Sequence, residues 1–307
     1  MGVTMNIVLA GGTGFLGSFL AERLLADGHR LTLLSRAPQR VAREGAGAVT
    51  MVRWDGKSVG DLAGSIDGAD AVVNLAGELI GGWRWTRAKK AKILSSRADA
   101  TNALVEAIGR ADKKPFVLIS MSGVGYYGSV EDGDVTEEHP PGRGFLADVC
   151  RVWEAAAMRA TLQGVRVVLL RCALVLGEGG PALARMVLPY RLFVGGRIGS
   201  GRQWFPWVHR ADYAAIVQAS LRSDSYAGPV TVAAPHCVTQ GEFAAELGRA
   251  LHRPSWMPVP APVLRIALGE MASLVLTGQR VVPQVLVRAG YQFRFPELAP
   301  ALADVLH

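Results

Sequence analysis

Cysteine is scarce in this chain of 307 residues, which has three. Cys150, Cys172 and Cys237 lie far apart and match neither a CxxC pair nor the spacing of metal ligands. An odd number of scattered cysteines argues against a disulfide framework. We therefore expect reduced thiols, no bound metal and a cytoplasmic protein.

Long hydrophobic runs are also missing. Charged residues such as Arg171 and Glu270 interrupt the apolar stretches, and none approaches the roughly 20 residues that a membrane helix needs. The first expected strand starts at Asn6, which leaves no room for a signal peptide. The net charge of +7 comes from scattered basic residues, so we expect neither a membrane nor nucleic acid as a partner.

A glycine-rich turn follows the first expected strand. The sequence Asn6-Ile-Val-Leu-Ala-Gly-Gly-Thr-Gly-Phe-Leu-Gly17 places glycines at 11, 14 and 17 between an apolar strand and a helix over 15–27. This spacing is typical of a dinucleotide-binding turn, in which the helix N-terminus faces the pyrophosphate. The predicted cofactor contacts here are Gly11, Gly12, Thr13, Gly14, Phe15, Leu16 and Gly17.

The second expected strand, 31–34, lacks the acidic residue that would bind the ribose of NAD. Ser35 and Arg36 follow it, and Arg40 lies close behind. A hydroxyl and a guanidinium suit a 2′-phosphate, so we predict NADP(H) rather than NAD(H). The alternative is that Arg36 is an ordinary surface arginine.

Strand and helix patterns alternate further along the chain. Strands are expected at 48–54, 71–77, 116–120 and 166–171, with helices at 86–108 and 145–162. This order predicts an α/β fold, a Rossmann-type doubly wound parallel sheet with a smaller C-terminal substrate domain. We assign 1–175 to the NADP-binding domain, to which 206–235 returns as a strand end and helix, and 176–205 and 236–307 to the smaller domain. The tail over 281–306 has a helical pattern.

Several motifs occur together in the order found in one family. They are Asn74-Leu-Ala-Gly-Glu78, Ser120-Met-Ser-Gly-Val-Gly-Tyr-Tyr-Gly128, Trp153-Glu154, Leu170-Arg-Cys-Ala-Leu-Val-Leu-Gly177, Gly199-Ser-Gly201, Phe205-Pro-Trp-Val-His-Arg-Ala-Asp212, Gly278-Gln-Arg-Val-Val-Pro283 and Gly290-Tyr-Gln-Phe293. Over essentially its full length the chain resembles the extended short-chain dehydrogenases/reductases, and within them an atypical branch, the epimerase family proteins. This resemblance implies an NADP-binding Rossmann domain, a small C-terminal substrate domain and a poorly defined substrate.

The resemblance also implies roles for single residues. It places Ser35 and Arg36 at the 2′-phosphate, Asp55 on the adenine side and Ser122 at the active-site serine position. A group near the nicotinamide ribose comprises Leu75, Ala76, Gly77 and Glu78. Ser120, which ends the fifth expected strand, completes the predicted cofactor contacts.

The chain departs from the wider superfamily at its Tyr-x-x-x-Lys pair. No lysine follows Lys114, and the helix reads Phe145-Leu-Ala-Asp-Val-Cys150 where the pair should lie. The usual dyad is therefore excluded. Ser122 and Tyr127 are the remaining catalytic candidates, because the loop after the fifth strand gathers ligands in such sheets; packing roles for Tyr126 and Tyr127 remain open.

Other candidates lie outside these motifs. The segment 195–207 could clamp a flat, anionic substrate or form a structural hairpin, so our candidate substrate contacts are Tyr126, Arg197, Arg202 and Trp204. Glu78 could bind ribose hydroxyls or form a salt bridge with Arg84 or Arg87. We expect His209 to be structural, and Glu137 and Glu138 to form an exposed acidic turn.

Two functions remain open at this point. The first is an NADP(H)-dependent oxidoreductase or epimerase that acts on a small anionic molecule with a non-standard active site. The second is a cofactor-binding sensor or scaffold without catalysis. Whether the protein is a monomer or a homodimer stays open.

Overall fold

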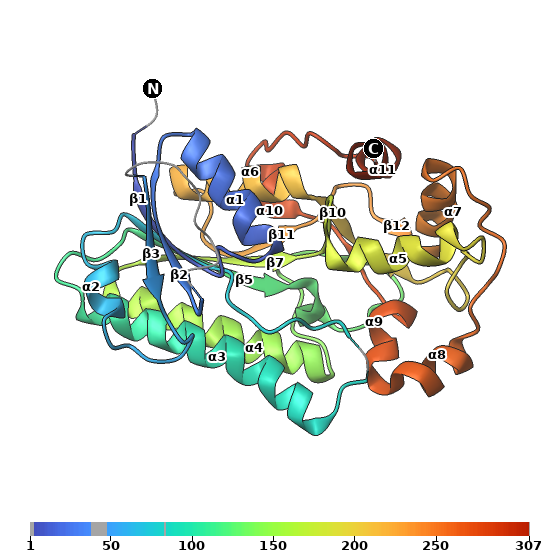
Figure 1. Ribbon diagram of the computed structural model, residues 1–307, viewed down its shortest axis with the longest axis horizontal. Coiled ribbons are helices and arrows are strands. Elements are labelled where there is room, and N and C mark those ends of the chain that lie inside the picture. The colour runs from blue at the N-terminus through green and yellow to red at the C-terminus, as the bar shows by residue number, and fades with distance from the viewer. Residues whose placement is uncertain (1–2, 38–47, 83, 307) are drawn as a thin grey trace.

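A seven-stranded parallel sheet forms the centre of the protein, as seen in a computed structural model that describes residues 3–37, 48–82 and 84–306 (Figure 1). Every neighbouring pair of its strands runs parallel. The spatial order is β11 (Gly228–Val232), β7 (Arg166–Cys172), β5 (Val117–Gly123), β4 (Ala71–Asn74), β1 (Asn6–Ala10), β2 (Arg30–Ser35) and β3 (Val49–Arg53). The predicted doubly wound α/β fold is confirmed.

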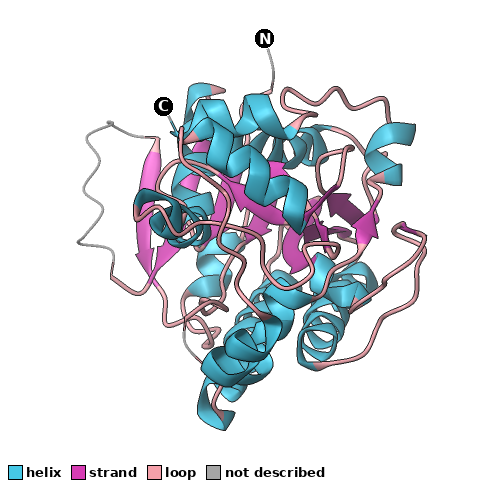
Figure 2. Ribbon diagram, turned by 90° about the vertical axis from the view of Figure 1, so that its right-hand side faces the viewer, coloured by secondary structure: helices cyan, strands magenta, loops and turns pink. Residues whose placement is uncertain are grey.

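Helices cover both faces of this sheet (Figures 1 and 2). One layer contains α1 (Phe15–Ala26), α6 (Arg210–Arg222) and α10 (Gln284–Arg288), and the other contains α2 (Leu62–Ile66), α3 (Arg87–Arg110), α4 (Phe145–Met158) and the 3-10 turn η3 (Arg159–Gln163). Successive side chains of a strand point to opposite faces. Ile7 and Leu9 of β1 accordingly pack in the first layer's core, while Val8 and Ala10 pack in the second.

A smaller part of the chain has its own core beside the sheet. It contains α5 (Pro181–Arg191), α7 (Gln240–Ala250) and α11 (Leu298–Leu306), whose apolar residues pack together. Further elements are β8 (Leu174–Leu176), β9 (Trp204–Phe205), β10 (Trp207–His209), β12 (Val238–Thr239), α8 (Ala261–Leu268), η4 (Gly269–Ala272) and α9 (Ser273–Leu276). Near the sheet, η2 (Val124–Tyr127) follows β5, and β6 (Asp134–Val135) pairs with β13 (Arg280–Val281).

Two expectations about the second half of the chain need correction. The strand before α6, β10, pairs with β8 instead of the large sheet, which gains β11 from this region. The tail is not continuously helical, because α10 ends at Arg288 and the chain runs without helix to α11. Gly290 has φ +69°, a conformation that ends helices. The division into two domains stays a prediction.

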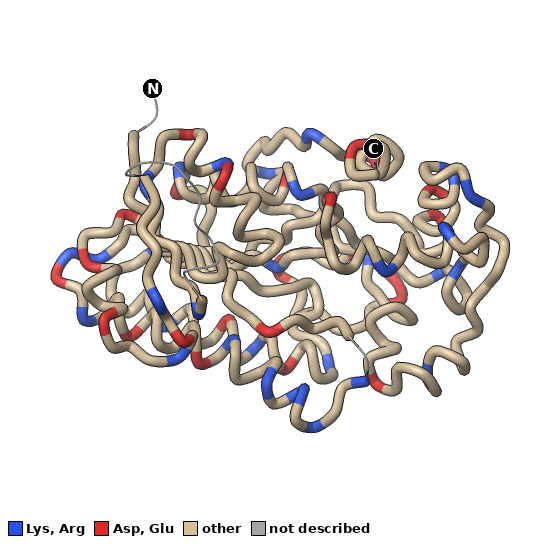
Figure 3. The backbone as a smooth tube through the Cα atoms, in the orientation of Figure 1, with Lys and Arg blue, Asp and Glu red and all other residues tan. Residues whose placement is uncertain are grey.

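Charge is distributed over the whole molecule. Figure 3 shows Lys and Arg spread along the backbone with Asp and Glu among them. Within the described ranges, the helices are too short or too polar to cross a membrane.

Candidate cofactor site and the Arg171 cluster

The glycine turn lies between the end of β1 and the start of α1. Gly11 has φ +79°, and a β-carbon there would lie 2.9 Å from the carbonyl carbon of Leu75. A β-carbon at Gly17 would collide with the carbonyl oxygen of Gly11. Both positions therefore require glycine, one for the conformation of the turn and one for the contact between helix and strand.

The N-terminus of α1 is open to an anion. Gly14 is its N-cap, no described side chain caps the helix, and its first turn carries no acidic residue. The free N–H groups and the helix dipole favour a phosphate there. Thr13 is exposed at this end, and the ring of Phe15 packs near Gly177. Gly12 and Leu16 complete the turn and its helix.

Ser35 and Arg36 lie at the carboxyl end of β2, beside the glycine turn. The Ser35 hydroxyl accepts a hydrogen bond from the N–H of Ala37 at 3.2 Å. Arg36 is exposed, and in the described part of the chain its guanidinium has no ion-pair partner. It is therefore available to a phosphate. Arg40 lies outside the described residues.

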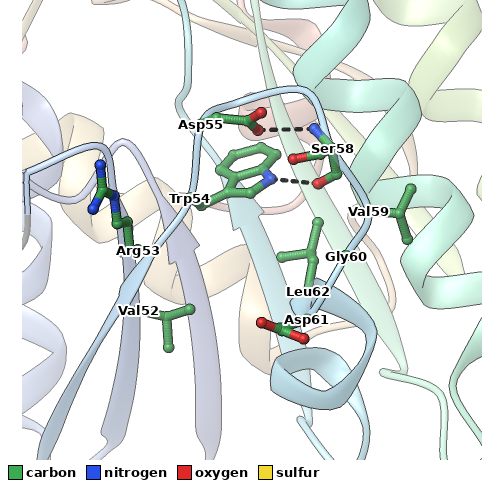
Figure 4. Close-up of a pocket in the computed structure, with 9 residues that line it drawn as sticks. All are labelled: Val52, Arg53, Trp54, Asp55, Ser58, Val59, Gly60, Asp61 and Leu62. Atoms are coloured by element: carbon green, nitrogen blue, oxygen red, sulfur yellow. Dashed lines mark hydrogen bonds between the residues drawn. The ribbon is translucent and has the colours of Figure 1, made fainter.

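A cavity of about 270 Å³ opens at the end of β3, next to this point (Figure 4). Asp55 lines it and accepts hydrogen bonds from the backbone N–H groups of Lys57 and Ser58 at 2.9 and 2.8 Å. These bonds lower the pKa of Asp55 to about 2. The indole of Trp54 donates to the Ser58 carbonyl at 2.8 Å. Asp55 thus shapes the loop around the cavity on the predicted adenine side.

The segment after β4 continues along the same edge of the sheet. Leu75 donates its N–H to Ala10, and Ala76 donates to the side chain of Asn74. Glu78 binds Lys89 at 2.8 Å and Lys92 at 3.4 Å. The hydrogen bond from Lys89 lowers the pKa of Glu78.

Glu78 therefore forms a salt bridge, which the sequence left open as the alternative to binding ribose hydroxyls, but its partners are not Arg84 or Arg87. Arg84 instead donates to the carbonyls of Ile266 and Ala267 at the end of α8. Lys89 lies one turn into α3, on the side that faces Glu78.

At the carboxyl end of β5, a buried ionic group occupies the place where catalytic candidates were predicted. Because β5 extends to Gly123, Ser122 lies within the strand and not in the loop after it. Ser120 is fully buried, and Ser122 donates to Glu154 at 2.7 Å. Glu154 forms a two-pronged ion pair with Arg171, at 2.9 and 2.8 Å. Arg171 is 3% exposed. The hydrogen bonds to Glu154 hold the pKa of Arg171 above its usual value against the opposing effect of burial.

Both predicted tyrosines contact this arginine. The guanidinium carbon of Arg171 lies 3.5 Å from the ring centre of Tyr126, and its Nη1 donates to the Tyr127 hydroxyl at 3.2 Å. Tyr127 is 1% exposed, with its hydroxyl 3.0 Å from that of Thr231. Burial raises the pKa of Tyr127. We call Ser122, Tyr126, Tyr127, Glu154 and Arg171 the Arg171 cluster.

Glu137 corrects another expectation, because it is 9% exposed and not part of an exposed turn. Its Oε1 accepts the backbone N–H of Thr231 at 2.9 Å. The segment returns inward because Val135, two residues earlier, is fully buried in β6. Glu138 is exposed beside Arg288, as expected.

The segment 195–207 lies in the smaller part of the molecule. Trp204 stacks with Arg280 at 5.3 Å, and the neighbouring Gln279 donates to the carbonyl of Val124, just before the two tyrosines. Arg197 and Arg202 are both exposed, and among the described residues neither guanidinium has an ion-pair partner. No contact within the described ranges joins these arginines to the Arg171 cluster.

Sequence reasoning gave no role to Glu154, Arg171 or Arg97. Glu154 and Arg171 were noted only as parts of motifs, where Glu154 follows Trp153 and Arg171 follows Leu170. Their pairing joins positions 17 residues apart on different elements, so no local spacing reveals it. His209, expected to be structural, is 1% exposed and caps α6 by accepting the N–H of Ala211.

Family models match most of the chain. The model of the NAD dependent epimerase/dehydratase family matches residues 7–232, and that of a domain of unknown function, DUF1731, matches residues 259–305.

Similar proteins carry the same family name. The human epimerase family protein SDR39U1 is 39% identical over 98% of this chain and 100% of its own length. The epimerase family protein YfhF of Bacillus subtilis is 37% identical over 98% of both chains. A homolog of SDR39U1 from Arabidopsis thaliana, described as chloroplastic, is 38% identical over 98% of this chain and 87% of its own.

Solved structures that resemble this chain also include epimerase family proteins and epimerases. The crystal structure of human epimerase family protein SDR39U1 (isoform 2) with NADPH has a TM-score of 0.87 and 37% identity, and covers 98% of this chain and 99% of that one. A nucleoside-diphosphate sugar epimerase from Corynebacterium glutamicum has a TM-score of 0.78 and 28% identity, and covers 99% and 58%. The chain therefore belongs to the NAD dependent epimerase/dehydratase family and, within it, to the epimerase family proteins of the extended short-chain dehydrogenase/reductase type.

Proposed function

We propose that this protein binds NADP(H) and uses it as an oxidoreductase or epimerase on a small anionic substrate. The observation that carries the proposal is the glycine turn with its open helix N-terminus, next to the guanidinium of Arg36 at the end of β2, which has no ion-pair partner among the described residues. A pyrophosphate fits the first and a 2′-phosphate the second. The NADPH in the crystal structure of human SDR39U1 supports the same cofactor.

Different residues would contact different parts of the bound cofactor. In open parallel sheets a dinucleotide lies across the carboxyl ends of the strands. The cavity around Asp55 would take the adenine, and 75–78 would border the nicotinamide ribose. Bound there, the nicotinamide supplies or accepts a hydride.

Ser122 and Tyr127 remain our candidates for the groups beside the reacting carbonyl or hydroxyl. The Tyr127 hydroxyl suits donation of a hydrogen bond, because burial raises its pKa and keeps it protonated at neutral pH. The Ser122 hydroxyl already donates to Glu154, so toward a substrate it would act as an acceptor. Arg171 and Glu154 would orient both hydroxyls. Arg197 and Arg202, which have no ion-pair partner in the part of the chain that the structure describes, support an anionic substrate.

One observation favours a second function. Tyr127 is 1% exposed, and its hydroxyl already contacts Thr231 and Arg171. A protein that binds NADP(H) without turnover, as a sensor or scaffold, could carry such a buried tyrosine.

Calorimetry followed by a substrate screen tests these functions. We expect tighter binding of NADPH than NADH, and loss of NADPH absorbance with a carbonyl compound that carries a carboxylate or phosphate. Binding without turnover across a broad metabolite set would favour the sensor. Absence of NADPH binding would contradict both functions.

A further inference from the structure

Arg97, on α3, is a buried cation that forms no ion pair with an acidic side chain among the described residues. It is 7% exposed, and its Nε is buried with no hydrogen-bond partner in the described part of the chain. Its Nη1 donates to the carbonyl of Ile93, one turn earlier on the same helix, at 3.0 Å. Burying an arginine is costly unless its donors find acceptors. Among the described residues the N–H groups of Nε and Nη2 therefore have no acceptor, and a bound ligand would supply one.

The nearest carboxylate is already occupied. Glu78 is close enough for its charge to act on Arg97, but Lys89 and Lys92 hold its two oxygens at 2.8 and 3.4 Å. The face of the guanidinium is also in use, since its central carbon lies 5.0 Å from the ring centre of Trp153 on α4. The α3 and α4 helices lie side by side under the sheet (Figure 1), which fixes this stacking.

The position of the guanidinium is defined by Gly77. A β-carbon at Gly77 would lie 3.1 Å from the guanidinium carbon and 3.3 Å from Nη2. Gly77 is two residues beyond Leu75, whose carbonyl carbon borders Gly11 of the phosphate turn. Arg97 consequently lies at the carboxyl end of β4, on the far side of the pyrophosphate position from Arg36 and Asp55.

The cation that α4 carries next to Cys150, Arg151, is exposed and pairs with Asp148. Cys150 stands in the segment where the superfamily's lysine was expected, and burial raises the pKa of its thiol to about 11, so that it stays neutral. The charge of Arg97 acts on this thiol and opposes that rise. Arg97 therefore brings to the buried side of α4, from α3, a positive charge that the exposed Arg151 does not supply there.

We propose that Arg97 binds the nicotinamide half of NADP(H), with its free N–H groups donating to the hydroxyl oxygens of the nicotinamide ribose. The proposal rests on the NADP(H) binding proposed above. An arginine stays charged at all physiological pH values, so Arg97 fixes the sugar and transfers no proton. Gly77 leaves the space that the guanidinium and the sugar share.

Calorimetry with two ligands tests this role on the full chain. NADPH reaches the nicotinamide ribose, whereas adenosine 2′,5′-bisphosphate ends before it. We expect Arg97→Met to weaken NADPH by about tenfold or more, the scale for hydrogen bonds from a charged group, and to leave the bisphosphate unchanged. Arg110→Met, which removes an exposed arginine from the end of the same helix, should change neither affinity.

Three results separate the proposals. Unchanged NADPH affinity in Arg97→Met, or equal loss for both ligands, would overturn the role of Arg97. Equal affinities of the wild-type chain for the bisphosphate and for NADPH would overturn the role of Arg97 as well. A wild-type chain that binds neither ligand would instead overturn the proposed function.

A second measurement avoids the methionine variant should that chain not fold. In the wild-type chain with 15N-labelled arginine, the Nε–H signal of Arg97 should shift on addition of NADPH and stay in place with the bisphosphate. The signal of Arg97 is identified as the one that disappears in Arg97→Lys, a variant that keeps the charge. A signal that ignores NADPH would contradict a contact with the ribose.

Discussion

Arg36 tests cofactor choice at the scale of one residue. Its guanidinium is exposed and unpaired among the described residues, at the end of β2. Arg36→Asp should weaken NADPH by about 1.5 to 3 kcal/mol, the range for a charge-assisted hydrogen bond, and improve NADH because a carboxylate accepts from a free 2′-hydroxyl. Calorimetry with both cofactors measures the change. Arg30→Asp, at the opposite end of β2, should leave both affinities unaltered; equal wild-type affinities for the two cofactors would refute the assignment.

Tyr127 separates the two proposed functions at the same scale. If the protein turns over a substrate, Tyr127→Phe should lower kcat by about 10²-fold, the scale of a lost general acid, with little effect on NADPH affinity. It should also cost about 1 kcal/mol of folding free energy, because the hydroxyl is buried and hydrogen bonded. Tyr190→Phe is the control, since it removes a buried hydroxyl that donates to the carbonyl of Ala244, outside the Arg171 cluster. A variant with wild-type kcat would remove Tyr127 from the mechanism.

At the scale of elements, the Glu154–Arg171 pair ties α4 to β7. Both side chains are buried, and two hydrogen bonds join them. Glu154→Gln leaves the Arg171 charge buried without a carboxylate, which should destabilise the protein by about 3 kcal/mol or more. Urea unfolding measures the loss.

Two comparisons give that result its meaning. Glu106→Gln removes an exposed pair with Arg110 on α3 and should cost less than about 1 kcal/mol. Replacing both partners, as Glu154→Leu with Arg171→Met, should cost less than Glu154→Gln if an uncompensated charge is the cause. A Glu154→Gln variant as stable as Glu106→Gln would show that water reaches Arg171.

For the whole molecule, the sequence predicts what depends on local order and misses what depends on distant pairing. The strands of the large sheet other than β11 were found because each is a short apolar run that ends at glycine or a polar residue, and the glycine turn needs only its own spacing. The pairing of β11 with β7, the burial of Glu137 and the contact of Arg97 with Gly77 all join separate elements. No periodicity in the chain encodes such contacts. Hence the cofactor end of the site was predictable in outline and the buried ionic groups were not.

Two buried histidines make the stability of the whole fold sensitive to acid. His29 and His209 are 4% and 1% exposed, and burial lowers the pKa of both. Each uses Nδ1 to accept a backbone N–H, from Met5 and from Ala211. Near pH 6.5 the unfolded chain therefore takes up protons that the folded chain does not, and stability falls as the pH drops below that value.

The expected loss between pH 7.5 and pH 5.5 is at most about 1.4 kcal/mol for each histidine, since one pH unit below the unfolded pKa corresponds to about 1.4 kcal/mol. Urea unfolding at both pH values measures it. The double variant His29→Asn with His209→Asn should flatten this dependence, because asparagine can accept the same N–H groups and does not titrate. His252→Asn is the matched control: His252 is exposed and has φ +52°, which asparagine tolerates. A double variant that keeps the wild-type pH dependence would assign the acid sensitivity to other groups.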